Sequence, residues 1–208
     1  PAREALEYLL RDYRGSPEVR IAVAGAYATL LGGDVEHMLA LLTGDHDFDA
    51  LRYALLGALR RALPVTELDE ARARAVFDTL IQLSDGTEPE LRRRALEVLN
   101  GEEFRDHVAR VGTLDDAARL VERLEYAGDQ ALRSSLLKLV ASFEQPALVE
   151  SLLLSPFFDE WTRGGPRNIS EMAAALARLA QGDPRVVMRS AARLLVDSRW
   201  ERHADAQL

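Results

Sequence analysis

Cysteine is absent from this sequence and lysine almost so, because only Lys138 among the 26 basic residues is a lysine. Without cysteine the chain forms no disulfide, carries no thiolate nucleophile and offers no thiolate ligand for zinc. The lack of disulfides fits a reducing compartment, so a cytoplasmic location is expected. The preference for arginine and alanine is a compositional habit of GC-rich, typically bacterial, genomes and does not indicate a function.

Long apolar runs are missing as well. No run approaches the roughly 20 residues that a membrane-spanning helix requires, and the opening residues 1–4 do not resemble a signal peptide. Hydrophobic residues make up 48% of the 208 residues and charged residues 29%, a mixture typical of a globular chain. The net charge of −8 argues against a general polyanion binder, although the distribution of charge matters more than its sum.

Strand patterns are also missing, because no segment alternates β-branched and polar residues with a period of two. Apolar residues recur with helical spacing instead, as in residues 1–13, where Leu6, Leu9 and Leu10 fall on one stripe. Residues 17–31 are apolar almost all round, which predicts a helix buried between neighbours. Further helices are predicted over residues 34–42, 49–63, 66–83, 89–99, 102–111, 114–126, 129–143, 146–154, 170–180 and 184–200. The sequence therefore predicts an all-α fold.

Five predicted helix starts share one pattern, in which a capping or acidic residue, often with proline, precedes an aliphatic residue and an arginine. They are residues 16–20 (SPEVR), 48–52 (FDALR), 88–92 (EPELR), 129–133 (DQALR) and 183–187 (DPRVV). Counted at the fifth residue, successive starts are 32, 40, 41 and 54 residues apart. Periods of this length are typical of stacked helix pairs, since one pair cannot bury its apolar face alone.

On these starts the chain resembles the HEAT-like, armadillo-type α-solenoids, in which such a segment opens the second helix of each pair. The resemblance extends over nearly the whole chain and implies a right-handed α-α superhelix of about 10 to 12 antiparallel helices. It implies one domain over residues 1–208 with an irregular insertion near residues 155–168. The copies differ, because Phe48 replaces a capping residue and Val187 replaces the arginine. A compact helical bundle without repeats is the alternative fold.

No catalytic, cofactor or metal-binding residue is predicted. Asp45, Asp47 and Asp49 alternate as at the start of a calcium loop, but the glycine of the sharp turn and the bidentate glutamate are both missing. Capping of a helix by Asp47 or Asp49 is the favoured interpretation. The four histidines lack the i, i+4 spacing of a helical metal site, and neither a G-x-S-x-G elbow nor a phosphate loop is present.

The insertion has two interpretations. Phe157, Phe158 and Trp161 lie close to Gly164 and Gly165, so the segment could protrude as an aromatic contact loop. Alternatively, the aromatic side chains belong to the core and the segment is a packed corner. We favour core packing.

Charge is distributed unevenly between the repeated helices and the rest of the chain. The five repeated helices together contain 13 basic and 9 acidic residues, whereas the rest of the chain contains 13 basic and 25 acidic residues. These helices are taken as residues 16–31, 49–62, 88–99, 129–144 and 183–199. Because second helices line the concave surface of such solenoids, the resemblance implies a basic concave face. The residues expected to bind a partner there are Arg60, Arg61, Arg93, Arg94, Arg133, Lys138, Arg189 and Arg193. Ion pairing of these side chains with neighbouring repeats is the alternative.

The expected function is that of a non-enzymatic scaffold, which binds another protein of acidic character on the concave surface. The alternative is a HEAT-like nucleic-acid-binding protein or an enzyme of the alkylpurine DNA glycosylase type, although no catalytic aspartate with a neighbouring tryptophan of that family could be matched. A bilin-lyase-like accessory protein would need a ligand cleft, which the sequence does not identify. No cofactor and no membrane contact are expected.

Overall fold

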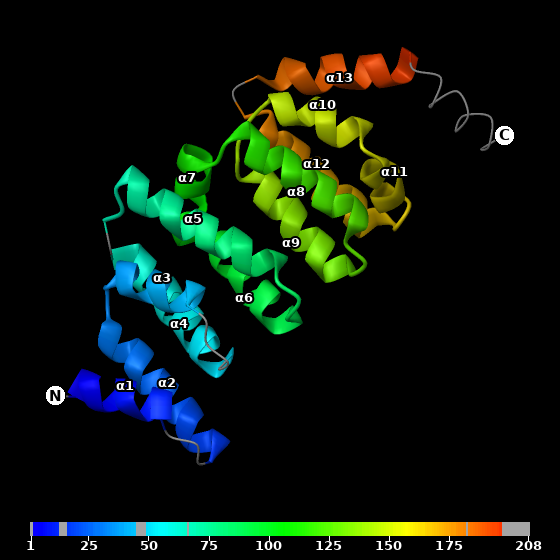
Figure 1. The fold of residues 1–208 in the computed structure, drawn as a ribbon. Coiled ribbons are helices and arrows are strands. Elements are labelled where there is room, and N and C mark those ends of the chain that lie inside the picture. The colour runs from blue at the N-terminus through cyan, green and yellow to red at the C-terminus, as the bar shows by residue number, and fades with distance from the viewer. Residues whose placement is uncertain (1, 13–15, 45–48, 66, 182, 197–208) are drawn as a thin grey trace. The chain divides into compact units, whose positions relative to one another are not determined.

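The computed structural model describes residues 2–12, 16–44, 49–65, 67–181 and 183–196, and every regular element in these ranges is helical (Figure 1). The prediction of an all-α fold is confirmed. The α-helices are α1 (Ala2–Asp12), α2 (Pro17–Leu31), α3 (Val35–Thr43), α4 (Asp49–Ala62), α5 (Glu70–Asp85), α6 (Pro89–Leu99), α7 (Glu102–Val111), α8 (Leu114–Tyr126), α9 (Gln130–Ala141), α10 (Ala147–Leu154), α11 (Pro156–Thr162), α12 (Pro166–Leu179) and α13 (Pro184–Val196). A short 3-10 helix, η1 (Leu63–Val65), follows α4. Among the described helices, none is long and apolar enough to cross a membrane.

Capping side chains explain why the helix starts can be predicted from the sequence. Asp34, Asp69 and Asp129 each accept a hydrogen bond from a backbone N–H in the first turn of α3, α5 and α9. Thr113 and Asp116 form a reciprocal capping box at the start of α8. Such caps satisfy amides that would otherwise lack a partner, and each contributes roughly 1 kcal/mol. Proline occupies the first turn of α2, α6, α11 and α12, where its missing N–H has no cost.

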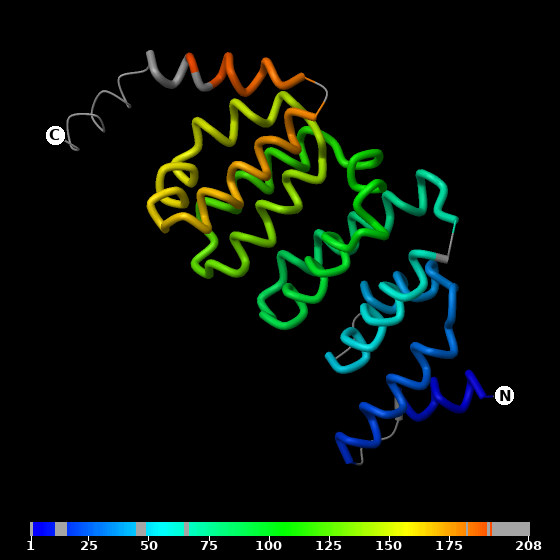
Figure 2. The backbone as a smooth tube through the Cα atoms, turned by 180° about the vertical axis from the view of Figure 1, so that it is seen from behind, coloured from blue at the N-terminus to red at the C-terminus, as the bar shows by residue number. Residues whose placement is uncertain are grey.

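The chain divides into two compact units, Pro1–His107 and Val108–Leu208. In the first unit, the pairs α1–α2, α3–α4 and α5–α6 follow one another along the chain. The helices α2, α4 and α6 pack side by side in one row, and α3 packs on α5 in the other, as both views show (Figures 1 and 2). The row places α4 between two neighbours, so Leu55, Leu56 and Leu59 are almost fully buried.

The first pair is less completely covered than its sequence predicts. Ala24, Tyr27, Ala28 and Leu31 of α2 are buried, but its remaining residues are not. The prediction of a helix buried on all sides is wrong, because α2 lies at the end of its row and only α1, α3 and α4 pack against it. No described side chain of α1 is fully buried either.

The second unit repeats the pairing with one helix inserted. Here α8 pairs with α9, α10 packs on α8, and α12 packs on α9, while α11 lies between α10 and α12 in the chain. The sequence placed the fifth repeated start at Asp183, which opens α13. The contacts correct this assignment, because the neighbour of α9 is α12, beginning at Pro166, and α13 packs on α10 and α12. The misassignment arose because α12 begins with glycine and proline and lacks the acidic cap of the other copies.

The insertion is a packed corner. Phe157 is fully buried and Trp161 is 2% exposed, and their ring centroids lie 5.3 Å apart. The side-chain amide of Asn168 donates to the carbonyl oxygen of Trp161 at 3.1 Å and accepts from the amide of Gln130 at 3.1 Å. Gly165 has φ +108°, which a residue with a side chain rarely adopts. The core interpretation is confirmed for Phe157 and Trp161.

Candidate functional site

The eight predicted partner-binding residues do not form one group. Two lie on each of four helices: Arg60 and Arg61 on α4, Arg93 and Arg94 on α6, Arg133 and Lys138 on α9, and Arg189 and Arg193 on α13. Only α4 and α6 are neighbours, whereas α13 packs on α10 and α12 and not in the row of α9. The side chain of Arg193 lies outside the described part of the structure.

The arginines of α6 are neutralised by their own helix. Arg93 forms ion pairs with Glu90 at 2.7 Å and with Glu97, and the Arg94 Nε lies 2.6 Å from a Glu90 oxygen. Hydrogen bonds from Arg93 and then Arg94 lower the pKa of Glu90 to about 2. Both arginines are therefore engaged within α6, which differs from the predicted ladder of ion pairs between repeats.

Arg94 also links the surface of α6 to that of α4. Its guanidinium carbon lies 5.1 Å from the ring centroid of Tyr53 on α4, a cation–π distance. Burial and a hydrogen bond to Glu88 raise the pKa of Tyr53 to about 12, so the phenol stays neutral at physiological pH. These contacts hold the outer faces of α4 and α6 together.

Arg133 and Arg189 are engaged as well. Arg133 donates to the carbonyl oxygen of Ala127, pairs with Glu160 at 2.5 Å and places its guanidinium 5.9 Å from the ring centroid of Phe157. It therefore fastens α9 to α11, and only 17% of its side chain is exposed. Arg189 pairs with Asp183 at 3.1 Å.

Three of the predicted residues remain available for a partner. Arg60, Arg61 and Lys138 are exposed, and no acidic side chain among the described residues forms an ion pair with them. Arg60 and Arg61 stand in the last turn of α4, where positive charge is favoured by the helix dipole. With Tyr53 and Gly57 they follow one side of the helix, and we call these four residues the α4 strip.

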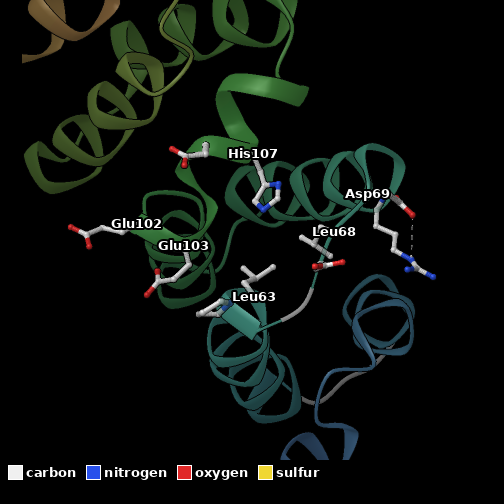
Figure 3. A pocket seen from close by; sticks show the side chains of 10 residues that line it. Leu63, Leu68, Asp69, Glu102, Glu103 and His107 are labelled. Carbon is white, nitrogen blue, oxygen red and sulfur yellow. Dashed lines mark hydrogen bonds and ion pairs between the residues drawn. The ribbon is translucent and has the colours of Figure 1, made fainter.

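A second candidate site is a cavity of about 850 Å³ in the first unit (Figure 3). It lies between the connection from α4 to α5 and the first turns of α7. Its lining residues are Leu63, Pro64, Glu67, Leu68, Asp69, Arg72, Glu102, Glu103, Asp106 and His107. The sequence does not predict this cavity, because its walls come from the connection between α4 and α5 and from the first turns of α7, and no local pattern indicates that these two segments meet.

The cavity combines an apolar floor with an acidic rim. Leu63 and Leu68 are 4% and 7% exposed, and Figure 3 shows the His107 ring pointing towards them while Glu102 points away. Its single arginine, Arg72, is engaged with Glu36 at 2.9 Å on α3 and with the cap Asp69. The carboxylates have a local role, since Asp69 caps α5 and Glu102 opens α7, where negative charge is favoured.

A hydrogen-bonded chain, also missed in the sequence, joins the first three helices. The Tyr27 hydroxyl on α2 lies 2.6 Å from a Glu7 oxygen on α1 and 3.0 Å from the His37 Nε2 on α3. Arg3 pairs with Glu7 at 3.2 Å and with Asp34 at 3.8 Å. Burial, followed by the bond to Glu7, raises the pKa of Tyr27 to about 12, and the bond from Tyr27 lowers the pKa of Glu7. This chain positions α1 on α2.

The segment of alternating aspartates, for which helix capping and not calcium binding was predicted, lies mostly outside the described residues. Residues 45–48, including His46, and the terminal residues Trp200 and His203 lie outside the described residues. Asp49 is the first residue of α4 and pairs with Arg52 at 3.6 Å. Within the described part of the chain, no group of three or more His, Asp or Glu side chains could hold a metal ion.

Comparisons with models of known protein families, with curated proteins and with solved structures give no match.

Proposed function

We propose that this chain is a non-enzymatic protein-interaction module built as a HEAT-like α-solenoid, and that it binds an acidic segment of another protein on the outer face of the α2–α4–α6 row. The observation that supports this most is the repeated packing of helix pairs in the first unit. Stacked helix pairs present extended surfaces, and proteins built in this way commonly use them for binding.

The α4 strip is the part of this face best suited to an acidic partner. Its two arginines are exposed and form no ion pair with a described acid, whereas Arg93 and Arg94 on the neighbouring helix α6 are paired with Glu90. The Arg61 guanidinium lies beside Gly57, because a Cβ built there would come within 3.6 Å of an Arg61 Nη atom. A guanidinium fork binds carboxylates in a bidentate manner. Of the eight residues predicted to bind a partner, we therefore propose Arg60 and Arg61 as the ones that bind it.

Nucleic acid is the alternative ligand. Binding to a phosphate backbone increases with the number of basic contacts and falls steeply with salt. Two available arginines on α4 provide few such contacts, and the surrounding unit is acidic, with 13 basic and 20 acidic residues over 1–107. An acidic protein segment, which needs only one or two bidentate contacts, fits this distribution better.

Affinity capture from a cell lysate, with and without nuclease, tests the proposal. The chain, its Arg60→Glu/Arg61→Glu variant and a control variant, Arg119→Glu on the exposed side of α8, serve as baits. We expect a protein that withstands nuclease, binds the control and is lost from the double variant. Recovery of nucleic acid that nuclease abolishes, or unchanged capture by the double variant, would contradict the proposal.

A further inference from the structure

The cavity of the first unit carries more negative charge than its own basic residues offset. Five of its lining residues are acidic and one is an arginine, so the lining has a net charge of −4 with His107 neutral. The arginine, Arg72, already pairs with Glu36 and Asp69. The other four acidic residues are exposed, and no basic side chain of the described residues forms an ion pair with them; they are Glu67, Glu102, Glu103 and Asp106. We call these four residues the acidic rim.

Acidic residues on the neighbouring helices are neutralised by arginines of their own helix. On α5, Asp78 pairs with Arg74 at 2.7 Å, and on α6, Glu90 pairs with Arg93 at 2.7 Å. Neither arginine of α7 lines the cavity. The acidic rim therefore differs from these two helix surfaces, because its carboxylates face the cavity without a countercharge.

Local helix chemistry explains only part of the acidic rim. Glu102 and Glu103 lie in the first turn of α7, where the helix dipole favours negative charge. Asp106 lies beyond that turn, four residues after Glu102, a spacing at which like charges on a helix repel each other. Glu67 precedes the capping residue of α5 and lies outside the helix. A bound cation would relieve the repulsion between Glu102 and Asp106.

The floor of the cavity requires more than charge from an occupant. Leu63 and Leu68 form an apolar floor, and the exposed Pro64 lies beside Leu63 in the chain. Figure 3 shows both leucines between the segments that carry the carboxylates. Lysine and arginine side chains match this combination, because their methylene stems cover apolar surface while the charged ends stay in water. A metal ion alone would leave the floor uncovered.

We propose that this cavity binds a segment of another protein through its lysine or arginine side chains. Charge complementarity selects this occupant, because the acidic rim attracts a basic segment and repels an acidic one. The volume of about 850 Å³ is more than one side chain fills, so the segment places two or more basic side chains in the cavity. The carboxylates are exposed to solvent, so binding should weaken as the salt concentration rises.

This site goes beyond the proposed function and does not depend on it. Arg60 and Arg61, which are proposed to bind an acidic segment, do not line the cavity. The Arg60→Glu/Arg61→Glu variant should therefore lose the acidic partner and still bind a basic peptide. Neutralising the acidic rim should have the opposite result, so the two proposals can fail separately.

Fluorescence anisotropy of a dye-labelled hexalysine peptide, titrated with the full chain at fixed salt, measures binding. The variant Glu102→Gln/Asp106→Asn removes two charges at exposed positions and should bind about tenfold more weakly. The matched control, Asp115→Asn/Glu122→Gln at exposed positions of α8, changes the net charge equally and should bind like the wild type. Absence of binding by the wild type, or equal weakening in both variants, would overturn the proposal.

Two further ligands test what the occupant must supply. A peptide of 2,4-diaminobutyric acid has the same number of amino groups as hexalysine but shorter stems, so it should bind more weakly if the stems cover the apolar floor. Equal binding of the two peptides would overturn the role of the floor. Spermidine and trilysine with blocked ends carry the same charge, and displacement of hexalysine by spermidine at the lower concentration would assign the cavity to a free polyamine and overturn the protein segment.

The position of the peptide is tested with cysteines, because the chain has none of its own. A hexalysine peptide that ends in cysteine is oxidised with Pro64→Cys, in the cavity lining, and with Ala174→Cys, at an exposed position of α12. A peptide held in the cavity brings its cysteine within disulfide distance of the lining, so Pro64→Cys should cross-link faster. Equal rates would show that the peptide is not held in the cavity and would overturn the proposal.

Discussion

The two units, Pro1–His107 and Val108–Leu208, are built from the same kind of helix pair but cover their surfaces differently. In the first unit the pairs stack in regular order, and both the outer face of α2 and an acid-lined cavity stay open. In the second unit α11 is inserted, and it buries two large aromatic rings in a corner. The charge differs as well, since the first unit has a net charge of −7 and the second, with 13 basic and 14 acidic residues, of −1.

The same kind of helix pair leaves exposed helix faces in the first unit and forms a packed corner in the second. Regular stacking leaves whole helix faces exposed, because each pair needs neighbours only on two sides. The insertion instead uses Phe157, Trp161 and Asn168 to join neighbouring helices, and Arg133 reaches across to Glu160. Substitutions should therefore affect stability most in the second unit and binding most in the first.

The largest effect on stability is expected from Trp161→Ala. The ring is 2% exposed, and removing a buried aromatic side chain from a corner that cannot collapse costs about 3–5 kcal/mol. Phe158→Ala, at a half-buried position of the same helix, is the matched control and should cost clearly less. Denaturant unfolding followed by circular dichroism measures both. Equal losses in the two variants would mean that the corner is not specifically packed around Trp161.

Gly112→Ala should produce the next largest effect. A Cβ at this position would collide with the buried ring of Phe143 and lie 2.7 Å from the carbonyl oxygen of Val108. Overpacking of this kind typically costs about 1–3 kcal/mol. Gly128→Ala, where a Cβ meets nothing within 4 Å, should leave the thermal midpoint close to that of the wild type. An unchanged thermal midpoint for Gly112→Ala would contradict the close approach of Gly112 to the Phe143 ring.

Tyr27→Phe tests how the first unit holds α1. Removing the hydroxyl from Glu7 and His37 should cost about 1–2 kcal/mol near neutral pH. The folded-state pKa of Glu7 lies below its ordinary value of 4.5, so its contribution is present above that pH and is lost as the pH falls. The wild type should therefore lose more stability on acidification than Tyr27→Phe. Parallel pH profiles of the free energy of unfolding would show that the hydroxyl does not stabilise the carboxylate.

Glu90→Gln should have the smallest effect on stability and a visible effect on binding. The pairs of Glu90 with Arg93 and Arg94 are exposed, and such pairs contribute little to folding. Removing the carboxylate should nonetheless release Arg94 from its ion pair, while Arg93 keeps its pair with Glu97, and should strengthen binding of an acidic partner. Affinity measured with the captured partner, at low and at high salt, provides the check. Weaker binding would indicate that Glu90 positions the arginines rather than occupying them.

Local sequence patterns are sufficient to predict the all-helical class and most helix starts. Asp34, Asp69, Asp129 and the proline-led starts act through hydrogen bonds and backbone geometry within one turn, so their effect is readable locally. Burial of Phe157 and Trp161 was also predictable, because large aromatic rings rarely stay exposed together. Ser16 was placed correctly as a helix start, although its hydroxyl bonds to Glu18 and not to the backbone.

Which helices become neighbours depends on contacts between distant parts of the chain. Whether α2 is covered depends on its place at the end of a row, which its own apolar residues cannot encode. The same holds for α12 as the neighbour of α9, and for the cavity between the α4–α5 connection and the first turns of α7. Half of the eight predicted basic residues form ion pairs within the chain, namely Arg93, Arg94, Arg133 and Arg189. The sequence could not predict these pairs, because it does not show whether a carboxylate three or four residues away, or on another helix, lies within reach of a guanidinium.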